Sequence, residues 1–302
     1  SGNSPGLWVP EGEGKKITIQ DADGGNNGKL TVQGADRFPG IGVELTGRES
    51  NITINSGTIF AYGGNYDAGI EVNSNSELTI NGGIITAEGG NNGAGIGGRD
   101  REAGGTCTIT GGTVTANGAN DATGIGNGFW GSGTSTFSTK DDKGNFGNAF
   151  IVTNGITDNA TGKKSDWSGV IFEGNNGNVY GSPTIQTDAK VPVGGTLTID
   201  KGQTLGIKEN ITLTNEGTIV NNGTIINNGQ LNGNGKITST VRHRTQITLQ
   251  EGSTNLSIED IKIYAISINR GENYEAISNP VGSILLEVLH NNELTFKIDI
   301  GS

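Results

Sequence analysis

The sequence predicts an all-β protein in which short parallel strands wind into a solenoid. Three stretches, which begin at Asn51, Glu77 and Thr106, repeat one pattern: a short alternating strand, a turn with glycine, a second alternating strand and a Gly-Ile pair. The inward residues recur in the same order in each copy, whereas hairpins would mirror them. A fixed repeat of this length indicates stacked units, none of which can bury its apolar face alone.

The composition supports ordered β structure and narrows the choice of partners. Glycine supplies 54 of the 302 residues without a three-residue period, prolines number only 6, and alternating Ile, Val, Leu and Thr recur, so neither collagen nor disorder fits. The net charge of −11 would repel a nucleic-acid backbone over most of the surface, and we expect no nucleic-acid partner. No apolar stretch approaches the roughly 18 residues that span a bilayer, so no membrane insertion is expected.

Wide coils are predicted over residues 15–128. The interval from Ile80 to Ile109 is slightly longer than the interval from Ile54 to Ile80, and the Gly-Ile pairs shift by the same amounts. The longer interval holds three extra residues, which fall in the segment 99–105, and the strand framework itself is unchanged.

Alternation along each strand predicts which side chains face the core. Successive residues of a strand point to opposite faces, so the apolar members point inward and the threonines point outward. We expect five inward columns: Ile52/Leu78/Cys107, Ile54/Ile80/Ile109, Ile59/Ile85/Val114, Ala61/Ala87/Ala116 and Ile70/Ile96/Ile125. The alanine column indicates a wall that lies close to its opposite neighbour, and Cys107 is interpreted as a core residue rather than a nucleophile.

The flanks of the wide coils are less regular. Leu30-Thr-Val32 resembles the first strand of the repeat, and only 11 residues separate Leu30 from Ile41, so we expect a tapering first coil that lacks the middle strand. Residues 129–190 lose the repeat and hold most of the large aromatic residues. This irregular aromatic insertion consists either of coils with long loops or of a packed unit on the side of the solenoid.

Residues 191–240 tighten to a six-residue period. Ile219, Ile225, Leu231 and Ile237 recur every 6 residues, which predicts triangular narrow coils of about 18 residues with asparagine at left-handed corners.

The C-terminal residues follow a different pattern. The glycine density falls after residue 240, and residues 241–302 predict antiparallel strands that form a C-terminal β cap or small β domain. An open solenoid end would expose unpaired strand edges, so a cover is expected. We therefore divide the chain into a parallel β-helix over residues 1–240 and a C-terminal unit over residues 241–302.

The repeats resemble a known group of proteins. Leu78-Thr-Ile-Asn-Gly-Gly83 with Gly93-Ala-Gly-Ile-Gly-Gly98, and Gly195-Thr-Leu-Thr-Ile-Asp-Lys-Gly202, look like phrases of the secreted, cell-surface β-helix repeat proteins of gut bacteria, which share the coil of pectate lyases. The resemblance covers roughly residues 15–240. It implies a single-stranded right-handed parallel β-helix, an extracellular or bacterial cell-surface location, and an adhesin or carbohydrate-binding role. The chain begins at Ser1 without a signal peptide, which we interpret as a mature or trimmed form.

Outward aromatic side chains form the first candidate ligand site. Phe60 and Tyr62 occupy outward positions of a second strand, beside Tyr66, and such rings could stack on sugars, because an aromatic face offers apolar area with polar handles at its edge. The alternative is packing under a neighbouring loop. Trp130 is a further candidate, although an irregular segment also needs aromatic residues for its own core.

A charged loop forms the second candidate. Arg99 and Arg101 lie in the run Arg-Asp-Arg-Glu over residues 99–102, the one dense charge cluster of the repeats, and could bind an acidic sugar; the alternative is a solvated turn. Segment 21–28 resembles a calcium loop, but Gly25 and Val32 stand where side-chain ligands are needed, so we interpret it as a turn.

Three functions remain open from the sequence. The first is a non-enzymatic extracellular surface protein, a monomer without cofactor or metal, that binds a polysaccharide or glycoconjugate. The second is a polysaccharide lyase or hydrolase with its acids in the irregular segment, drawn from Asp141, Asp142, Asp158, Asp166 and Glu173. The third is a structural spacer.

The outward residues of the repeats favour display over catalysis. By resemblance to pectate lyases, a lyase would need carboxylates on one outward strand face to hold Ca²⁺, with an Arg or Lys nearby to abstract a proton. The outward residues of the first strand are Thr53, Thr79 and Thr108, which form no carboxylate column.

Overall fold

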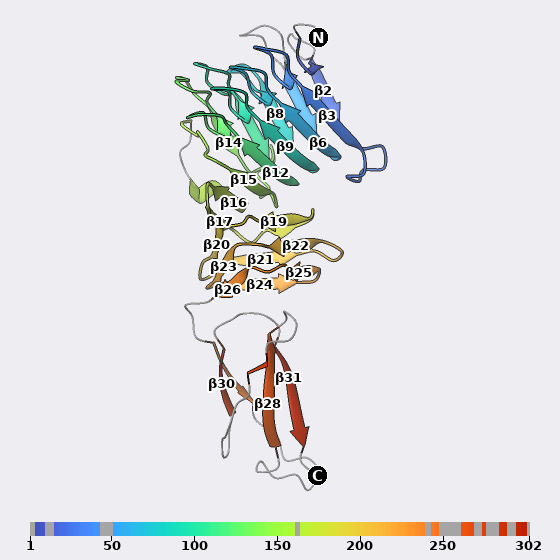
Figure 1. Cartoon of the computed structure of the whole chain (residues 1–302), viewed down its shortest axis with the longest axis vertical. Helices are drawn as coiled ribbons and strands as arrows, with labels where there is room; N and C mark the ends of the chain where they lie inside the picture. Colours follow the sequence, from blue (N-terminus) through green and yellow to red (C-terminus); the bar gives the residue numbers. More distant parts are fainter. Residues whose placement is uncertain are drawn as a thin grey trace.

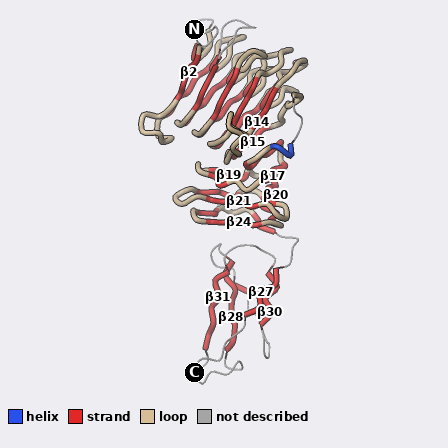
Figure 2. The backbone as a smooth tube through the Cα atoms, turned by 180° about the vertical axis from the view of Figure 1, so that it is seen from behind, coloured by secondary structure: helices blue, strands red, loops and turns tan. Residues whose placement is uncertain are grey.

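The computed structural model describes residues 4–9, 15–42, 51–160 and 164–238, together with five strands between residues 243 and 300. The chain is all-β with almost no helix, and within the described residues the one helical segment is the 3₁₀ turn η1 (Lys164–Asp166). Figure 1 shows the strands from β2 to β26 as stacks, in which neighbouring strands are parallel except for β16 and β17, and Figure 2 shows the same stacks from behind. This arrangement is compatible with a β-helix or another solenoid.

Three sheets contain the strands of the wide coils. Sheet 1 is formed by very short strands: β1 (Leu7–Trp8), β4 (Ile41–Gly42), β7 (Ile70–Glu71), β10 (Ile96–Gly97) and β13 (Ile125–Gly126). Sheet 2 contains β2 (Lys16–Ile19), β5 (Asn51–Ile54), β8 (Glu77–Ile80), β11 (Thr106–Ile109) and β14 (Thr136–Ser138). Sheet 3 begins with β3 (Lys29–Gln33), β6 (Thr58–Tyr62), β9 (Ile84–Glu88), β12 (Thr113–Asn117), β15 (Phe150–Thr153) and β16 (Gly169–Glu173).

The remaining strands up to residue 238 form the narrow coils. Sheet 3 continues with β17 (Asn176–Tyr180), β20 (Thr196–Ile199), β23 (Thr218–Asn221) and β26 (Lys236–Thr238). Sheet 4 contains β18 (Thr184–Ile185), β21 (Thr204–Ile207) and β24 (Thr224–Asn227). Sheet 5 contains β19 (Ala189–Val191), β22 (Thr212–Asn215) and β25 (Gln230–Asn232).

The predicted core columns are confirmed by the strand registers. Leu78 pairs with both Ile52 and Cys107, and the alanine and isoleucine columns pair in the same way along sheets 1 to 3. Every member of the five columns is buried, while Thr53, Thr79 and Thr108 are in register on the outward face. Each circuit of the chain therefore passes through sheets 2, 3 and 1 in that order.

The first coil differs from its prediction. Leu30 pairs with Ile59 in sheet 3, so β3 is the middle strand that the sequence interpretation found missing, and β2 supplies the first strand. The spacing argument used the wrong landmark, because the 11 residues from Leu30 to Ile41 equal the 11 residues from Ile59 to Ile70. The first described coil is therefore complete.

The aromatic segment 129–190 lies within the sheets. β14 extends sheet 2 and β15 to β17 extend sheet 3, so its strands continue the stacks, and Phe137, Phe150, Trp167 and Phe172 enter their cores. Trp167 packs edge-on against Phe137, and Phe150 packs against Phe172. Of the two alternatives for this segment, the described strands fit coils with long loops.

Sheet 3 changes direction in this segment. β15 and β16 are parallel, β16 and β17 are antiparallel, and β17 and β20 are parallel again. The core changes face at the same place: Ile151 and Ile171 pack into the wide-coil core, whereas Phe172 and Val179 pack into a second core on the opposite face. β15 and β16 are consequently buried on both faces.

The two reversals compensate each other. Reversing the strand direction alone would invert the winding sense of the coil, and moving the core to the other face of the sheet alone would do the same. Since both occur between β15 and β17, the wide and narrow coils wind with the same hand.

The narrow coils have the predicted repeat of three hexads, because Ile219 pairs with Ile237 across sheet 3. The prediction that asparagines form left-handed corners is wrong for the hexad residues, since the one narrow-coil asparagine with positive φ is Asn210. Asn215 and Asn221 are instead fully buried, and Asn215 bonds to backbone groups of the neighbouring coil and turn.

The described C-terminal strands pair antiparallel, as predicted. β27 (His243–Ile247) pairs with β30 (Ile284–Val288). β28 (Ile261–Ile268) pairs with β29 (Tyr274–Glu275) and with β31 (Leu294–Ile300). The role of these strands as a cap, and the domain boundary at residue 240, stay predictions.

Candidate functional site

The candidate site is built from turns on either side of sheet 1. The turn that follows sheet 3 carries Tyr66 and Asp67, and the turn that follows sheet 1 in the next coil carries residues 99–102. The lengthened second turn folds back onto the first, since the Asp100 amide donates to the Tyr66 carbonyl at 3.0 Å. In the following coil the Arg101 amide donates to the Phe129 carbonyl at 2.7 Å. The three extra residues therefore bring the two turns together.

Several large side chains of these turns stand on left-handed backbone. Arg37, Tyr66, Arg101 and Trp130 have φ between 54° and 68°. Glycine or asparagine is the usual residue in such a conformation, and a bulky side chain there is uncommon. The backbone at these corners directs the four side chains outward, where Tyr66 is 43% exposed and Trp130 is 70% exposed.

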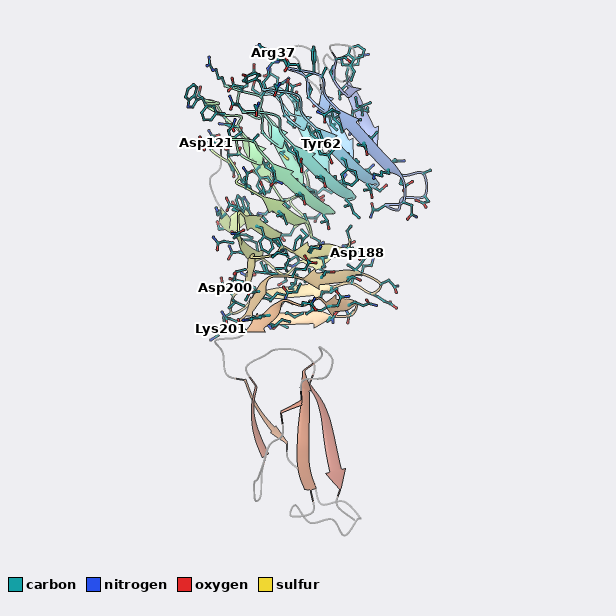
Figure 3. The ribbon with its side chains drawn as sticks, in the orientation of Figure 1. Arg37, Tyr62, Asp121, Asp188, Asp200 and Lys201 are labelled. Atoms are coloured by element: carbon teal, nitrogen blue, oxygen red, sulfur yellow. The ribbon has the colours of Figure 1, made fainter. Side chains whose placement is uncertain are left out.

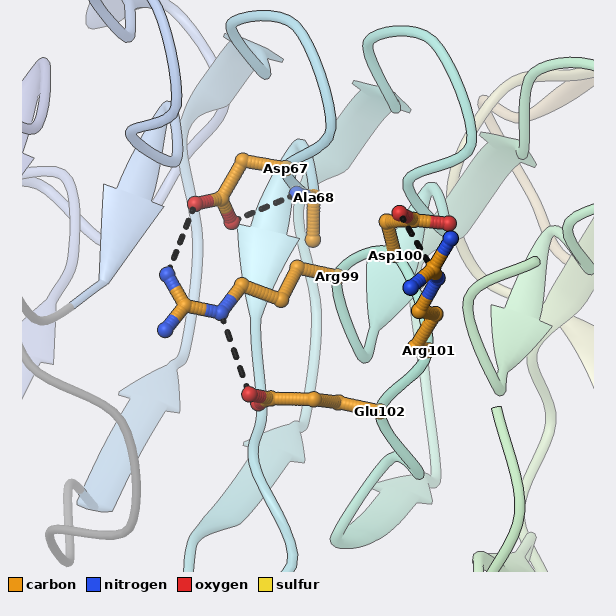
Figure 4. Close-up of polar contacts among 6 residues, drawn as sticks. All are labelled: Asp67, Ala68, Arg99, Asp100, Arg101 and Glu102. Atoms are coloured by element: carbon orange, nitrogen blue, oxygen red, sulfur yellow. Dashed lines mark hydrogen bonds and ion pairs between the residues drawn. The ribbon is translucent and has the colours of Figure 1, made fainter. Parts of the chain in front are cut away.

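The centre of the site is a buried carboxylate, Asp67, which is only 1% exposed. Its Oδ1 accepts a hydrogen bond from the Ala68 amide at 2.8 Å, and its Oδ2 lies 3.8 Å from Arg99 Nη1 (Figure 4). Arg99 Nε also lies 3.2 Å from Glu102 Oε1. Burial raises the pKa of Asp67 to about 7, against the lowering effects of the Ala68 amide and Arg99, and Glu102 raises it further.

Two arginine–aromatic contacts flank this centre. The Arg37 guanidinium lies 5.4 Å from the centre of the Tyr66 ring, and the Arg101 guanidinium lies 5.6 Å from that of Trp130. Phe129 stacks on Trp130 at 4.6 Å. Cation–π pairs of this kind hold an arginine over a ring face.

A polar cavity of about 440 Å³ lies among these groups. It is lined by Arg37, Tyr66, Asp67, Arg99, Asp100 and Arg101, and we call it the arginine cavity. Its volume falls within the range of small-molecule sites. The structure thus brings together Tyr66, Arg99 and Arg101 of the sequence candidates, with Trp130 at the edge through its contact with Arg101.

Phe60 and Tyr62 lie elsewhere. Both stand half-buried on the outward face of β6, and the Lys29 ammonium is 4.8 Å from the centre of the Phe60 ring. Figure 3 places Tyr62 over the strands and Arg37 among the loops at the edge of the coils. The strand face and the arginine cavity are therefore separate candidate surfaces.

Sequence reasoning missed two lining residues, Arg37 and Asp67, whereas Asp100 lay within the charged run over residues 99–102 without being named as a ligand-binding residue. Asp67 was detectable as an exception in the repeat, because the equivalent position of the next coil is Gly93. Arg37 and Tyr66 occupy equivalent turn positions of successive coils, which predicts stacking of their side chains once the first coil is aligned correctly.

Four of the five acids proposed for catalysis in the irregular segment, Asp141, Asp158, Asp166 and Glu173, have separate local contacts. Asp141 accepts hydrogen bonds within its own turn, and the Asn145 side chain is the main cause that lowers its pKa. The other contacts are an Asp158 bond from the Phe137 amide, an Asp166 ion pair with Lys140, and a Glu173 ion pair with Lys164. Each of these contacts joins an acid to a different partner.

Cys107 is a core residue, as predicted. It is 4% exposed between Leu78 and Phe137 in sheet 2, and burial raises the pKa of its thiol to about 12. The described ranges contain no group of three His, Cys, Asp or Glu side chains that could hold a metal ion. Within those same ranges no helix has the length and hydrophobicity needed to cross a membrane.

Comparisons with known proteins gave no match for this chain. No protein-family model, no curated protein and no solved structure matches the chain.

Proposed function

We propose that this chain is a non-enzymatic carbohydrate-binding protein of the cell surface, and that it displays its ligand site on the turns of a rigid solenoid. One observation carries the proposal: the arginine cavity gathers the Tyr66 ring and hydrogen-bonding charged groups from three successive coils, with the exposed Trp130 ring of the next coil at its edge. Aromatic faces and planar polar groups are the surfaces on which sugar rings and their hydroxyls bind. Export, and a right-handed single-stranded β-helix similar to that of pectate lyases, belong to the same proposal.

The outward residues of sheet 2 support binding over lyase chemistry. Thr53, Thr79 and Thr108 lie in register there, so this face offers hydroxyl groups and no row of carboxylates for a divalent cation. Four of the five proposed acids of the irregular segment contact separate local partners, which also favours binding.

A glycan array probed with the purified full chain tests the proposal, combined with assays for reducing ends and unsaturated products on the polysaccharides that bind. Binding without product is the expected result. Product formation would move the chain to the lyase or hydrolase class, and the absence of both would favour a structural spacer.

Matched variants locate the binding surface. Tyr66→Asn and Trp130→Asn remove the rings while asparagine tolerates the left-handed backbone at both positions. Phe146→Asn removes a ring that is 62% exposed in a different loop and serves as the control. We expect the first two variants to weaken glycan binding and the control to leave it unchanged. Weakening by Phe60→Ala alone would instead assign binding to the outward face of β6.

A further inference from the structure

Two buried carboxylate oxygens in the arginine cavity lack a hydrogen-bond donor. Within the described residues, no group donates to Asp67 Oδ2 or to Asp100 Oδ1. Asp67 is 1% exposed, and its Oδ2 meets Arg99 only through the 3.8 Å ion pair, which is longer than a hydrogen bond. Buried polar atoms are nearly always hydrogen-bonded, so both oxygens, on residues that line the cavity, have unused capacity to accept a hydrogen bond.

The charges of the cavity are already balanced. Arg37, Arg99 and Arg101 line the cavity together with Asp67 and Asp100, and Glu102 lies beside Arg99, so three positive groups stand near three negative ones once Asp67 is ionised. Arg101 Nε lies 3.7 Å from Asp100 Oδ2, so each of the two loop arginines has a carboxylate beside it. An acidic ligand would have to compete with these carboxylates, and a metal ion would face the Arg99 guanidinium. A neutral ligand meets neither obstacle.

We infer that the arginine cavity binds a neutral, hydroxyl-rich sugar unit, whose hydroxyl groups donate to Asp67 and Asp100 and accept from Arg37 or Arg101. The Tyr66 ring, which is 43% exposed, lies beside these groups, and the part that Arg37 leaves uncovered supplies the apolar contact for the sugar ring. This inference rests on the proposed function and names its ligand class. It differs from the acidic sugar that the sequence offered as one alternative for the run over residues 99–102, because each loop arginine has a carboxylate beside it.

The test measures affinity for three probes: a neutral oligosaccharide from the array, a uronate oligosaccharide and a sulfated one. Asp67→Asn and Asp100→Asn keep the shape of each side chain and replace one carboxylate oxygen by an amide donor. Asp121→Asn, on an exposed turn of a later coil, is the matched control (Figure 3). We expect a tenfold to hundredfold loss of neutral-sugar affinity in the first two variants, the size of a lost bond to a charged group, and no change in the control. The melting temperature of each variant separates lost binding from unfolding.

The outcomes distinguish this inference from the proposed function. Neutral-sugar binding that survives both Asp67→Asn and Asp100→Asn overturns the inference and leaves the proposed function in place. Preference for the uronate or sulfated probe, together with weaker binding in Arg37→Gln, also overturns it and restores the acidic-sugar interpretation. If no glycan binds, the proposed function fails and the inference fails with it.

Discussion

The wide and narrow coils use similar strands but different turns. The chain from Leu78 to Cys107, one wide circuit, is longer than the chain from Ile219 to Ile237, one narrow circuit, although their sheet 3 strands have five and four residues. The additional chain of a wide coil therefore lies largely in turns. All residues that line the arginine cavity come from these turns. The strands set the size of the core, and the turns set what the surface can bind.

The wide and narrow coils also have separate cores. Each lies on its own face of sheet 3, and β15 and β16 separate them as a layer that packs into both. Gly177 of β17 has no side chain because a Cβ there would lie 2.5 Å from the Phe172 ring. The two solenoid segments are therefore joined through apolar packing as well as through the chain.

Truncation of a side chain in the layer formed by β15 and β16 should have the largest effect on stability. Depending on the face, it should destabilise either the wide or the narrow coils first. Phe172→Ala should cost about 3–5 kcal/mol and Ile171→Ala about 2–5 kcal/mol, because both side chains are buried and a cavity would remain. Hydrogen exchange should show lost protection first in β20 and β23 for Phe172→Ala, and first in β9 and β12 for Ile171→Ala. Identical exchange patterns for the two variants would contradict separate cores.

Asp67→Asn should change how the stability of the wide coils depends on pH, because Asp67 is a buried acid with a raised pKa. A pKa raised from 3.8 to about 7 means that the folded state favours the neutral carboxyl, so stability from this group is present below pH 4 and lost as pH rises to about 7. The variant should gain on the order of 1–4 kcal/mol relative to the unmodified chain over this interval. Thermal unfolding at pH 4 and pH 8 measures the difference. If the variant and the unmodified chain differed in stability by the same amount at both pH values, the raised pKa of Asp67 would be contradicted.

A larger side chain in the alanine column tests how closely that wall of the wide coils packs against the opposite wall. Ala87 is fully buried between Ala61 and Ala116, so Ala87→Leu should destabilise by about 1–3 kcal/mol. Thr86→Leu on the outward face is the control and should change stability by less than about 0.5 kcal/mol. Equal melting temperatures for the two variants would argue against the inside and outside faces described for β9.

Two buried asparagines test the narrow coils with the smallest effects. Asn215→Leu should cost about 1–3 kcal/mol, because the Lys236 carbonyl and the Gly217 amide would lose their partner. Asn221→Leu should be neutral or stabilising by up to about 1 kcal/mol, since neither amide atom of Asn221 has a hydrogen-bond partner within the described residues. Denaturant titration measures both. Equal losses would imply that Asn221 also has a partner.

The sequence predictions were accurate where the repeat occurs in several copies and less accurate outside them. Three copies of the repeat established the inward columns. The first coil was misaligned because the segment that contains Leu30 resembles both the first and the second strand of the repeat. The run Val170-Ile171-Phe172 is apolar at consecutive positions, which is typical of a strand buried on both faces. Our sequence predictions did not use this pattern, which carries no information about the direction of β17.

The periodic strands, the columns of the core and the site of the three-residue insertion could be predicted from the sequence alone. They depend on residues that are near in the chain or recur at a fixed period. The tertiary structure decided the reversal within sheet 3 and the assembly of the arginine cavity. Tyr66, Arg99 and Trp130 are far apart along the chain, yet they become neighbours because each circuit advances only about 4.8 Å. Burial of Asp67 then follows from the longer turn that folds over it.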